Sequence, residues 1–197
     1  YVTSGFSWES GEQAQVNRLL QSKQFHGLVR PVVCLECPVS DTYPSKHWAL
    51  NNNPPAYDTP DEDVYLVGRN ILLLAKVSAY CAINRIERIA IGPLNGNPFP
   101  DATPEFFRSM QQALSQGLDH NLEIVAPFSR LSKADVIKRG QLLGVPFELT
   151  VSCMKPLETT HCGRCSKCRE RLLAFQNAGI SDPASYDFTP HDIVHGD

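Results

Sequence analysis

Residues 68–92 read GRNILLLAKVSAYCAINRIERIAIG, and this stretch decides the class of fold. Its first part, residues 68–84, is a long apolar run of helix-forming length and predicts a helix. Its last part, residues 88–92, is a short apolar run that ends in glycine, which is typical of a buried strand. A buried strand directly after an apolar helix indicates an α/β fold, in which helices cover a parallel sheet.

The same alternation continues on both sides of residues 68–92. The predicted helices are residues 8–22, 103–118, 132–143 and 165–177, and the predicted strands are residues 1–5, 29–39 and 123–127. Gly179 is placed to end the last helix. The pattern predicts a mostly parallel, Rossmann-type sheet with helices on both faces, and such sheets bind ligands beyond the carboxyl ends of their strands. Residues 40–63, which are polar and proline-rich, predict a long functional loop or lid.

The bulk composition limits the classes of function. The chain has 197 residues, of which 42% are hydrophobic, and a formal net charge of −3. A slightly acidic chain argues against non-specific electrostatic binding to nucleic acid or to an anionic membrane. No run approaches the roughly 18 consecutive apolar residues of a membrane span. These features predict a soluble, cytoplasmic protein.

Four of the seven cysteines, Cys153, Cys162, Cys165 and Cys168, lie within 16 residues in the pattern C-x8-C-x2-C-x2-C. Two-residue spacers let neighbouring sulfurs converge within about 4 Å, as tetrahedral zinc requires, and Gly163 permits the tight turn between ligands. Four protein ligands leave no open coordination position. The prediction is therefore one structural Zn²⁺ ion rather than a catalytic one.

The cysteine pattern leaves alternatives open. A pair of disulfides or an iron–sulfur cluster uses similar spacing, and His161 is placed to replace one sulfur. Four basic side chains are expected to offset the charge of a Zn(Cys)4 centre: Arg164, Lys167, Arg169 and Arg171. The other cysteines, Cys34, Cys37 and Cys81, are predicted to lie in the hydrophobic core.

Three further positions indicate a ligand site. Gly68, Arg69 and Asn70 open a helix, where free backbone N–H groups and a guanidinium would bind an anion. The loop that begins at Gly92 offers hydrogen-bonding groups for a polar heterocycle at Asn95, Asn97 and Asp101, with Phe99 as a stacking face. Lys133, at the start of another helix, is placed to reach a phosphate. Plainer alternatives are an ordinary helix start, a helix cap at Asp101 and a surface lysine.

These pieces together resemble the 7-cyano-7-deazaguanine synthase (QueC/ExsB-like) family of PP-loop ATPases. The matching segments are residues 68–70, 100–106, 127–134 and 144–153 and the C-x2-C-x2-C run with Arg169 and Arg171, in unbroken order. The resemblance implies an adenine nucleotide alpha hydrolase-like domain at residues 1–150 and a zinc-binding segment with a closing helix at residues 151–197. It also implies a possible homodimer.

The implied activity is that of an ATP-dependent carbon–nitrogen ligase in queuosine biosynthesis. ATP with Mg²⁺ would adenylate 7-carboxy-7-deazaguanine or a similar small-molecule carboxylate and release pyrophosphate. Ammonia would then give an amide, and a second adenylation with dehydration would give the nitrile. By the same resemblance Arg69, Asn70, Asp101 and Lys133 line the cleft, with Lys133 and Asp101 as catalytic residues.

Two departures from the family pattern affect the expected function. The family's Ser-Gly-Gly-x-Asp-Ser loop is not among these residues, so we expect it upstream of residue 1 and expect this chain alone to be inactive. Residues 93–99 also differ from the acidic, tyrosine-bearing segment of the synthases. Open alternatives are a related enzyme that adenylates another substrate or a tRNA base, and a non-catalytic, zinc-stapled binding or regulatory protein. A zinc-ribbon nucleic-acid binder is disfavoured because few basic residues flank the cysteines.

Overall fold

The computed structural model describes residues 1–188. Helices alternate with short strands in the order β1 (Val2–Thr3), α1 (Glu9–Gln21), β2 (Leu35–Glu36), η1 (Asp61–Val64), α2 (Arg69–Ile83), β3 (Arg88–Ala90), η2 (Pro100–Ala102), α3 (Pro104–Gly117), β4 (Glu123–Val125), α4 (Lys133–Leu142), η3 (Phe147–Leu149) and α5 (Ser166–Ala178). The predicted α/β class is therefore confirmed. None of the helices within residues 1–188 combines the length and apolar character that a bilayer-crossing segment needs.

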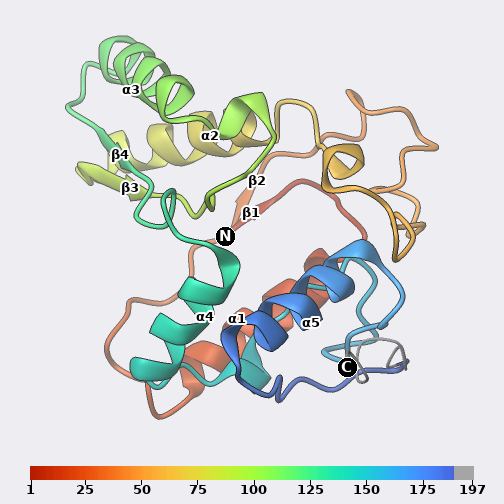
Figure 1. Cartoon of the computed structure of the whole chain (residues 1–197). Helices are drawn as coiled ribbons and strands as arrows, with labels where there is room; N and C mark the ends of the chain where they lie inside the picture. The colour runs from red at the N-terminus through yellow and green to blue at the C-terminus, as the bar shows by residue number, and fades with distance from the viewer. Residues whose placement is uncertain (189–197) are drawn as a thin grey trace.

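The helices begin and end at residues whose side chains or backbone suit these positions. The Thr103 hydroxyl accepts a hydrogen bond from the Phe106 N–H at 3.1 Å and caps α3. Ser132 and Asp135 form a reciprocal capping box at the start of α4. Gly179, with a φ of +70°, ends α5 as predicted. In Figure 1, α2 and α3 lie with β3 and β4, whereas α1, α4 and α5 form a separate group.

The strands form two parallel pairs, β1 with β2 and β3 with β4. The predicted parallel direction is confirmed, but residues 1–188 do not form one larger sheet. A cavity of about 290 Å³ lies between the two pairs, lined by Val2 of β1, by Ile89 and Ala90 of β3, and by Leu74 and Val77 of α2. Ala90 is exposed although it lies within an apolar run, so this edge of β3 is open.

The hydrogen bonds within each pair show which backbone groups face the cavity. The carbonyls of Tyr1 and Thr3 accept hydrogen bonds from the β2 segment at 2.8 and 2.7 Å. Because a parallel strand bonds to one neighbour through alternate residues, Val2 directs its N–H and C=O to the opposite edge. The same alternation turns the backbone groups of Arg88 and Ala90 away from β4. Two strand edges therefore face each other across the cavity.

The predicted strand at residues 29–39 is much shorter in the structure. Only residues 35–36 form β2, and the Val29 and Val33 side chains are 48% and 45% exposed. Cys34 is exposed and Cys37 is half-buried, so the prediction that both belong to the core is wrong. The reason is that β2 pairs with β1 alone among the described strands. Cys81, at 4% exposure, is buried as predicted.

The long polar segment at residues 40–63 is a loop, as predicted, but it contributes to the core. Tyr43 and Ala49 are buried in the same hydrophobic cluster as the four clustered cysteines. Trp48 stacks on Trp8 from the start of α1, with 5.6 Å between ring centroids. Val39, at 2% exposure, anchors the start of the loop. The loop is therefore packed against the hydrophobic core and is not a freely exposed lid.

A buried ion pair fixes α5 to the segment that follows it. The Arg171 guanidinium makes two hydrogen bonds of 2.8 Å to Asp182, and their side chains are only 5% and 6% exposed. Arg171 also donates to the Thr150 hydroxyl at 2.8 Å, and the Tyr186 hydroxyl donates to Asp182 at 2.6 Å. Burial raises the pKa of Asp182, but these hydrogen bonds outweigh burial and the pKa lies below its ordinary value.

We expect Asp182→Ala to lower the free energy of unfolding by about 3–5 kcal/mol, because it leaves Arg171 buried without its counter-ion. Chemical denaturation near pH 7 measures this loss. The matched control is Glu123→Gln, which breaks the exposed pair of Arg88 and Glu123 and should change stability little. Equal losses in the two variants would show that the Asp182 pair is no stronger than a surface pair.

Candidate metal centre and active-site cavity

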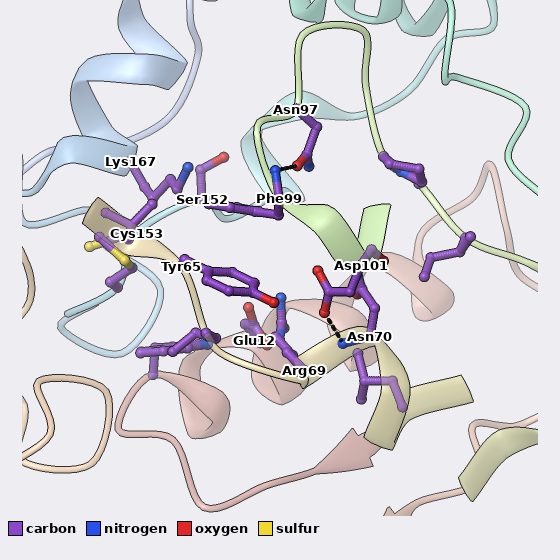
Figure 2. A pocket seen from close by; sticks show the side chains of 18 of the residues that line it. Glu12, Tyr65, Arg69, Asn70, Asn97, Phe99, Asp101, Ser152, Cys153 and Lys167 are labelled. Atoms are coloured by element: carbon purple, nitrogen blue, oxygen red, sulfur yellow. Dashed lines mark hydrogen bonds between the residues drawn. The ribbon is translucent and has the colours of Figure 1, made fainter. Parts of the chain in front are cut away.

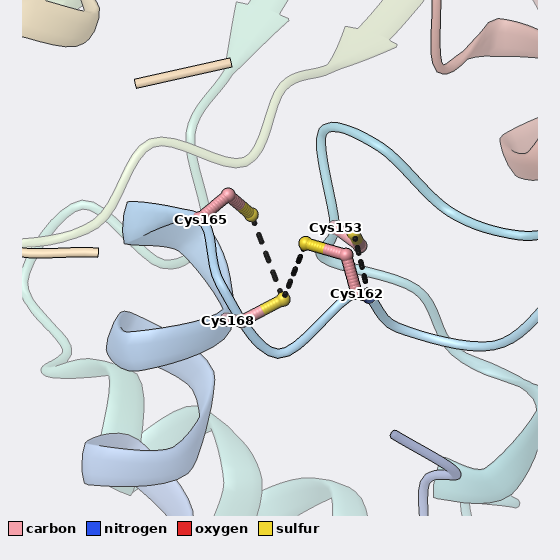
Figure 3. A group of neighbouring side chains, drawn as sticks. All are labelled: Cys153, Cys162, Cys165 and Cys168. Carbon is pink, nitrogen blue, oxygen red and sulfur yellow. Dashed lines mark hydrogen bonds between the residues drawn. The ribbon is translucent and has the colours of Figure 1, made fainter. Parts of the chain in front are cut away.

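The four predicted cysteines converge at one buried point (Figure 3). Their sulfur atoms all lie within 4.8 Å of one another. The Sγ–Sγ distance is 3.9 Å between Cys162 and Cys168 and 3.5 Å between Cys165 and Cys168. A tetrahedral zinc ion with Zn–S bonds near 2.3 Å places its sulfurs about 3.8 Å apart. The arrangement therefore fits one four-coordinate metal ion.

Backbone N–H groups surround these sulfurs and favour the thiolate form that binds metal. The Cys153 sulfur accepts hydrogen bonds from the N–H groups of Lys155 and Cys162 at 3.2 and 3.3 Å. The Cys162 sulfur accepts one from the Arg164 N–H at 3.4 Å. Gly163 has a φ of +69°, which favours glycine and gives the predicted tight turn. All seven cysteines are free, so the structure does not support the disulfide alternative.

His161 supports the metal centre from outside the group of four sulfurs. Its ring is 1% exposed, and its Nε2 atom accepts a hydrogen bond from the Ser152 N–H at 3.1 Å. The ring packs on Tyr186 with 5.0 Å between centroids. Burial, together with the Arg171 charge, lowers the pKa of His161 to about 4. A neutral histidine thus holds the backbone next to Cys153.

The basic side chains near the cysteines have partners of their own, and the prediction that all four offset the charge of a Zn(Cys)4 centre stays a prediction. The contacts are Lys167 with Glu170, Arg169 with Asp61 and the Thr59 carbonyl, Arg171 with Asp182, and Arg164 over the Phe188 ring.

A cavity of about 430 Å³ opens beside the metal centre (Figure 2). This volume is within the range of small-molecule sites. Six of the predicted ligand-site residues line it, namely Arg69, Asn70, Gly92, Asn97, Phe99 and Asp101. Gly68, Asn95 and Lys133 are not among its lining residues. Ser152, Cys153 and Met154 form the wall on the side of the metal centre.

The start of α2 is joined to Asp101 rather than open to a ligand. The Asp101 carboxylate accepts a hydrogen bond from the Asn70 N–H at 3.0 Å, and the Asn70 side chain donates to the Asp101 carbonyl at 2.9 Å. Asp101 is only 4% exposed. The carboxylate thus acts as a cap for α2 from a distant loop. Its predicted catalytic role stays a prediction.

The Arg69 guanidinium is the cation that remains available at this end of the cavity. No hydrogen bond or ion pair of this guanidinium occurs within residues 1–188; it lies 6.0 Å from the centroid of the Phe6 ring, and its charge acts on the Glu12 carboxyl by lowering the pKa of that group. Its predicted role as an anion clamp is compatible with that placement.

The loop after β3 places an aromatic surface in the cavity. The Asn97 side chain accepts a hydrogen bond from the Phe99 N–H at 3.0 Å and so fixes the loop. The Phe99 ring stacks on Tyr65, with 5.0 Å between centroids and 20° between planes. Asn95 is held outside the cavity by a hydrogen bond from its N–H to the Leu131 carbonyl at 3.0 Å. The predicted stacking face therefore lies where a planar ligand would fit.

Lys133, at the first position of α4, contacts α5 instead of the cavity. Its amine pairs with Glu170, which also binds Lys167. Burial lowers the pKa of the Lys133 amine, and the Glu170 carboxylate partly opposes this effect. Its predicted catalytic role also stays a prediction.

Several residues of the cavity wall were not predicted as site residues: Glu12, Trp8, Trp48, Tyr65 and Lys167. Trp8 and Glu12 are four residues apart in the predicted helix, but the other three come from segments far apart in the chain, so no local spacing connects all five. The sequence signals were the length of the loop at residues 40–63, which was expected to be functional, and the place of Lys167 beside the cysteines.

The fold and the site define a class: an α/β protein in which four cysteines that could hold a metal ion adjoin a cavity at the carboxyl end of a parallel strand pair. A family model described as "Queuosine biosynthesis protein QueC" matches residues 49–179. The chain therefore belongs to this family.

Relatives of known name agree with this family. The 7-cyano-7-deazaguanine synthase of Oceanobacillus iheyensis is 40% identical over 132 residues, which cover 64% of this chain and 59% of that protein. The enzyme of the same name from Thermoplasma volcanium is 39% identical over 132 residues, 64% of this chain and 54% of that protein. The enzyme of the same name from Halobacterium salinarum is 41% identical over 130 residues, which cover 64% of this chain and 56% of that protein. The chain thus matches little more than half the length of these relatives.

We expect the purified protein to contain one tightly bound zinc ion and Cys165→Ala to lose it, with a lower melting temperature, because three ligands hold structural zinc poorly. Elemental analysis and thermal unfolding measure the two effects. The matched control is Cys81→Ala, which removes another buried sulfur but should keep the zinc. Metal-free protein that melts normally would contradict the zinc assignment, and a visible absorption band with bound iron would favour an iron–sulfur cluster.

We expect Asp101→Ala to lower the free energy of unfolding by about 1–2 kcal/mol, as loss of a helix cap does. Asp101→Asn keeps an oxygen acceptor for the Asn70 N–H and should lose less. Urea denaturation measures both. If Asp101→Asn kept its stability and lost its turnover, the carboxylate would have a catalytic role beyond the cap.

Proposed function

We propose that this chain carries the substrate- and metal-binding part of an ATP-dependent synthase of the 7-cyano-7-deazaguanine type, acting in queuosine or 7-deazapurine biosynthesis. The main observation in favour of this proposal is that Cys153 belongs both to the metal centre and to the wall of the cavity, within the region that matches the family. The cavity is also lined by Ile91, Gly92 and Pro93, directly after β3, where parallel strands present ligands.

The chemistry of the proposed reaction matches the groups in the cavity. A carboxylate is a poor electrophile, and adenylation by ATP with Mg²⁺ gives it a stable leaving group. Ammonia then displaces AMP and forms the amide. A second ATP adenylates the amide oxygen, and loss of AMP together with the amide N–H protons gives the nitrile. The stacked pair of Tyr65 and Phe99 suits a planar 7-deazapurine acid, and the unpaired Arg69 suits an anionic group.

The cavity between β1 and β3 is where we expect the strand that carries the ATP loop. Their unpaired edges face each other across the smaller cavity, so a strand inserted there in parallel would complete a single sheet of Rossmann type. Glu12, Arg69 and Ile91 line both cavities. A loop that follows the inserted strand would therefore reach the larger cavity beside Arg69.

The remaining features of the proposal follow from the resemblance and the site. Zinc is structural because four sulfurs complete its coordination. The division at residues 1–150 and 151–197 is retained, with residues 189–197 outside the described part. A homodimer, a cytoplasmic location that keeps the cysteines reduced, and the absence of a nucleic-acid partner stay predictions.

A second candidate is a related enzyme that adenylates another carboxylate or a tRNA base. The observation in its favour is the loop at residues 93–99, where Asn97 and Phe99, rather than acidic and tyrosine side chains, line the cavity. A non-catalytic binding protein is the alternative from another class, and the same experiment separates all three.

The test uses the protein extended to its natural N-terminus, with ATP, Mg²⁺, ammonium and 7-carboxy-7-deazaguanine. We expect pyrophosphate release that depends on the acid and a nitrile product in the mass spectrum. Arg69→Met should lower kcat/KM by about 10- to 100-fold, because a charge-assisted contact is lost. Residues 1–197 alone should bind zinc and release no pyrophosphate.

Two other outcomes would change the proposal. A folded, zinc-loaded, extended protein that releases no pyrophosphate with any carboxylate tested or with unmodified tRNA would contradict it and favour a binding protein. Turnover with a different carboxylate or with tRNA, but not with the deazapurine acid, would favour the second candidate.

A further inference from the structure

Three carboxylates line the two cavities, and two of them hold the backbone in place. Glu9 lines the smaller cavity, Asp101 lines the larger one, and Glu12 lines both. The two oxygens of Glu9 accept hydrogen bonds from the Ser4 N–H at 2.7 Å and the Gly5 N–H at 3.0 Å. Asp101 caps α2. Glu12 is therefore the carboxylate that the fold leaves available to a ligand.

The Glu12 carboxylate is oriented through one of its oxygens and open at the other. Glu12 follows Trp8 by four residues at the start of α1, so both side chains leave the helix on the same face, and both line the larger cavity. Its Oε2 atom accepts a hydrogen bond from the Tyr1 hydroxyl at 2.5 Å, whereas Oε1 makes none within residues 1–188. Figure 2 shows Glu12 beside Arg69 on the cavity wall.

Glu12 lies where the two cavities meet. Like Arg69, it lines the larger and the smaller cavity. In the proposed reaction the ATP loop enters from the smaller cavity, and the planar acid stacks on Phe99 and Tyr65 in the larger one. The acyl adenylate would then form at the junction, with its phosphate at Arg69 and its acyl carbon on the same side as Glu12. Ammonia must reach that carbon.

The groups that face Glu12 suit a proton acceptor. Burial raises the pKa of the Glu12 carboxyl above its ordinary value, and the negative charge of Glu9 adds to this rise. The Tyr1 hydrogen bond and the Arg69 charge lower the same pKa without outweighing burial. A carboxylate of raised pKa is a stronger base. Within residues 1–188 no histidine lines either cavity to take this role instead.

We propose that Glu12 is the catalytic base that accepts a proton from the ammonia nucleophile. The inference rests on the proposed function and assigns a residue to its second step. The ammonia nitrogen bonds to the acyl carbon, the bond from that carbon to the AMP oxygen breaks, and its electron pair leaves with AMP. One N–H proton of the adduct passes to the Glu12 carboxylate, which leaves the neutral amide.

The competing explanation is that Glu12 only holds Tyr1 and offsets the charge of Arg69. A residue with that role would affect adenylation and amide formation equally.

The experiment follows the two half-reactions separately in the zinc-loaded, N-terminally extended protein. Exchange of labelled pyrophosphate into ATP, dependent on 7-carboxy-7-deazaguanine and measured without ammonium, reports adenylation. Amide formation at saturating ammonia reports the attack. Glu12→Gln should keep the exchange within about threefold, because adenylation of a carboxylate releases no proton, and should lower kcat for the amide by about 100- to 10,000-fold. Glu12→Asp keeps a carboxylate and should recover part of the loss.

The pH profile of amide formation separates a base from a structural residue. With free ammonia saturating at every pH, kcat should fall as the pH falls through the pKa of Glu12, because a protonated carboxyl accepts no proton. Tyr1→Phe removes a hydrogen bond that lowers this pKa, so it should move the fall to higher pH. Glu12→Gln should abolish the fall.

The matched control is Glu36→Gln, the same change at an exposed residue of β2 outside both cavities, which should alter neither half-reaction. If Glu12→Gln does not fold, Tyr1→Phe carries the test through its pH profile. Unchanged amide formation in Glu12→Gln, equal losses in both half-reactions, or an unshifted profile in Tyr1→Phe would overturn the inference while the proposed function stands. Absence of acid-dependent exchange in the unsubstituted protein would refute the proposed function itself.

Discussion

Four sulfur atoms in the middle of a hydrophobic cluster hold together segments that have little regular structure of their own. Phe6 and Trp8, Tyr43 and Ala49 of the long loop, and Leu66 before α2 all pack in the same cluster as the metal-binding cysteines. Structural zinc contributes about 10–16 kcal/mol in small zinc-binding peptides, whereas burial of one large apolar side chain contributes about 1.5–3 kcal/mol. A metal ion bound by these four cysteines would therefore be the main constraint on this side of the cavity.

The sequence predicted best those features whose cause is local. Thr103, Ser132 and Gly179 mark helix ends through contacts within a few residues, and the cysteine spacing determines which sulfurs can converge. The strand at residues 29–39 was predicted too long because the length of a strand depends on its neighbours. β2 has one neighbour in the described structure, and its apolar flanks at Val29 and Val33 stay exposed.

The site was predicted in part for the same reason. Arg69, Asn70 and Asp101 were expected near one another, and the structure joins them at the start of α2. Local pattern could not tell which lysine reaches the cavity, because Lys133 and Lys167 both begin helices and differ only in how α4 and α5 pack. Glu170, on α5, binds both amines, and of the two lysines only Lys167 lines the cavity.

The position of Lys167 connects the metal centre with the geometry of the cavity. Lys167 lies between two of the clustered cysteines, so a bound metal ion would restrict its backbone, whereas its amine is held by the contact with Glu170 at 2.7 Å. The adjacent wall is fixed in the same way, since Cys153 is a ligand and the neutral His161 holds the Ser152 N–H. A metal ion without an open coordination position would thus still restrict the shape of the cavity, because Cys153 and its neighbours Ser152 and Met154 form part of the cavity wall.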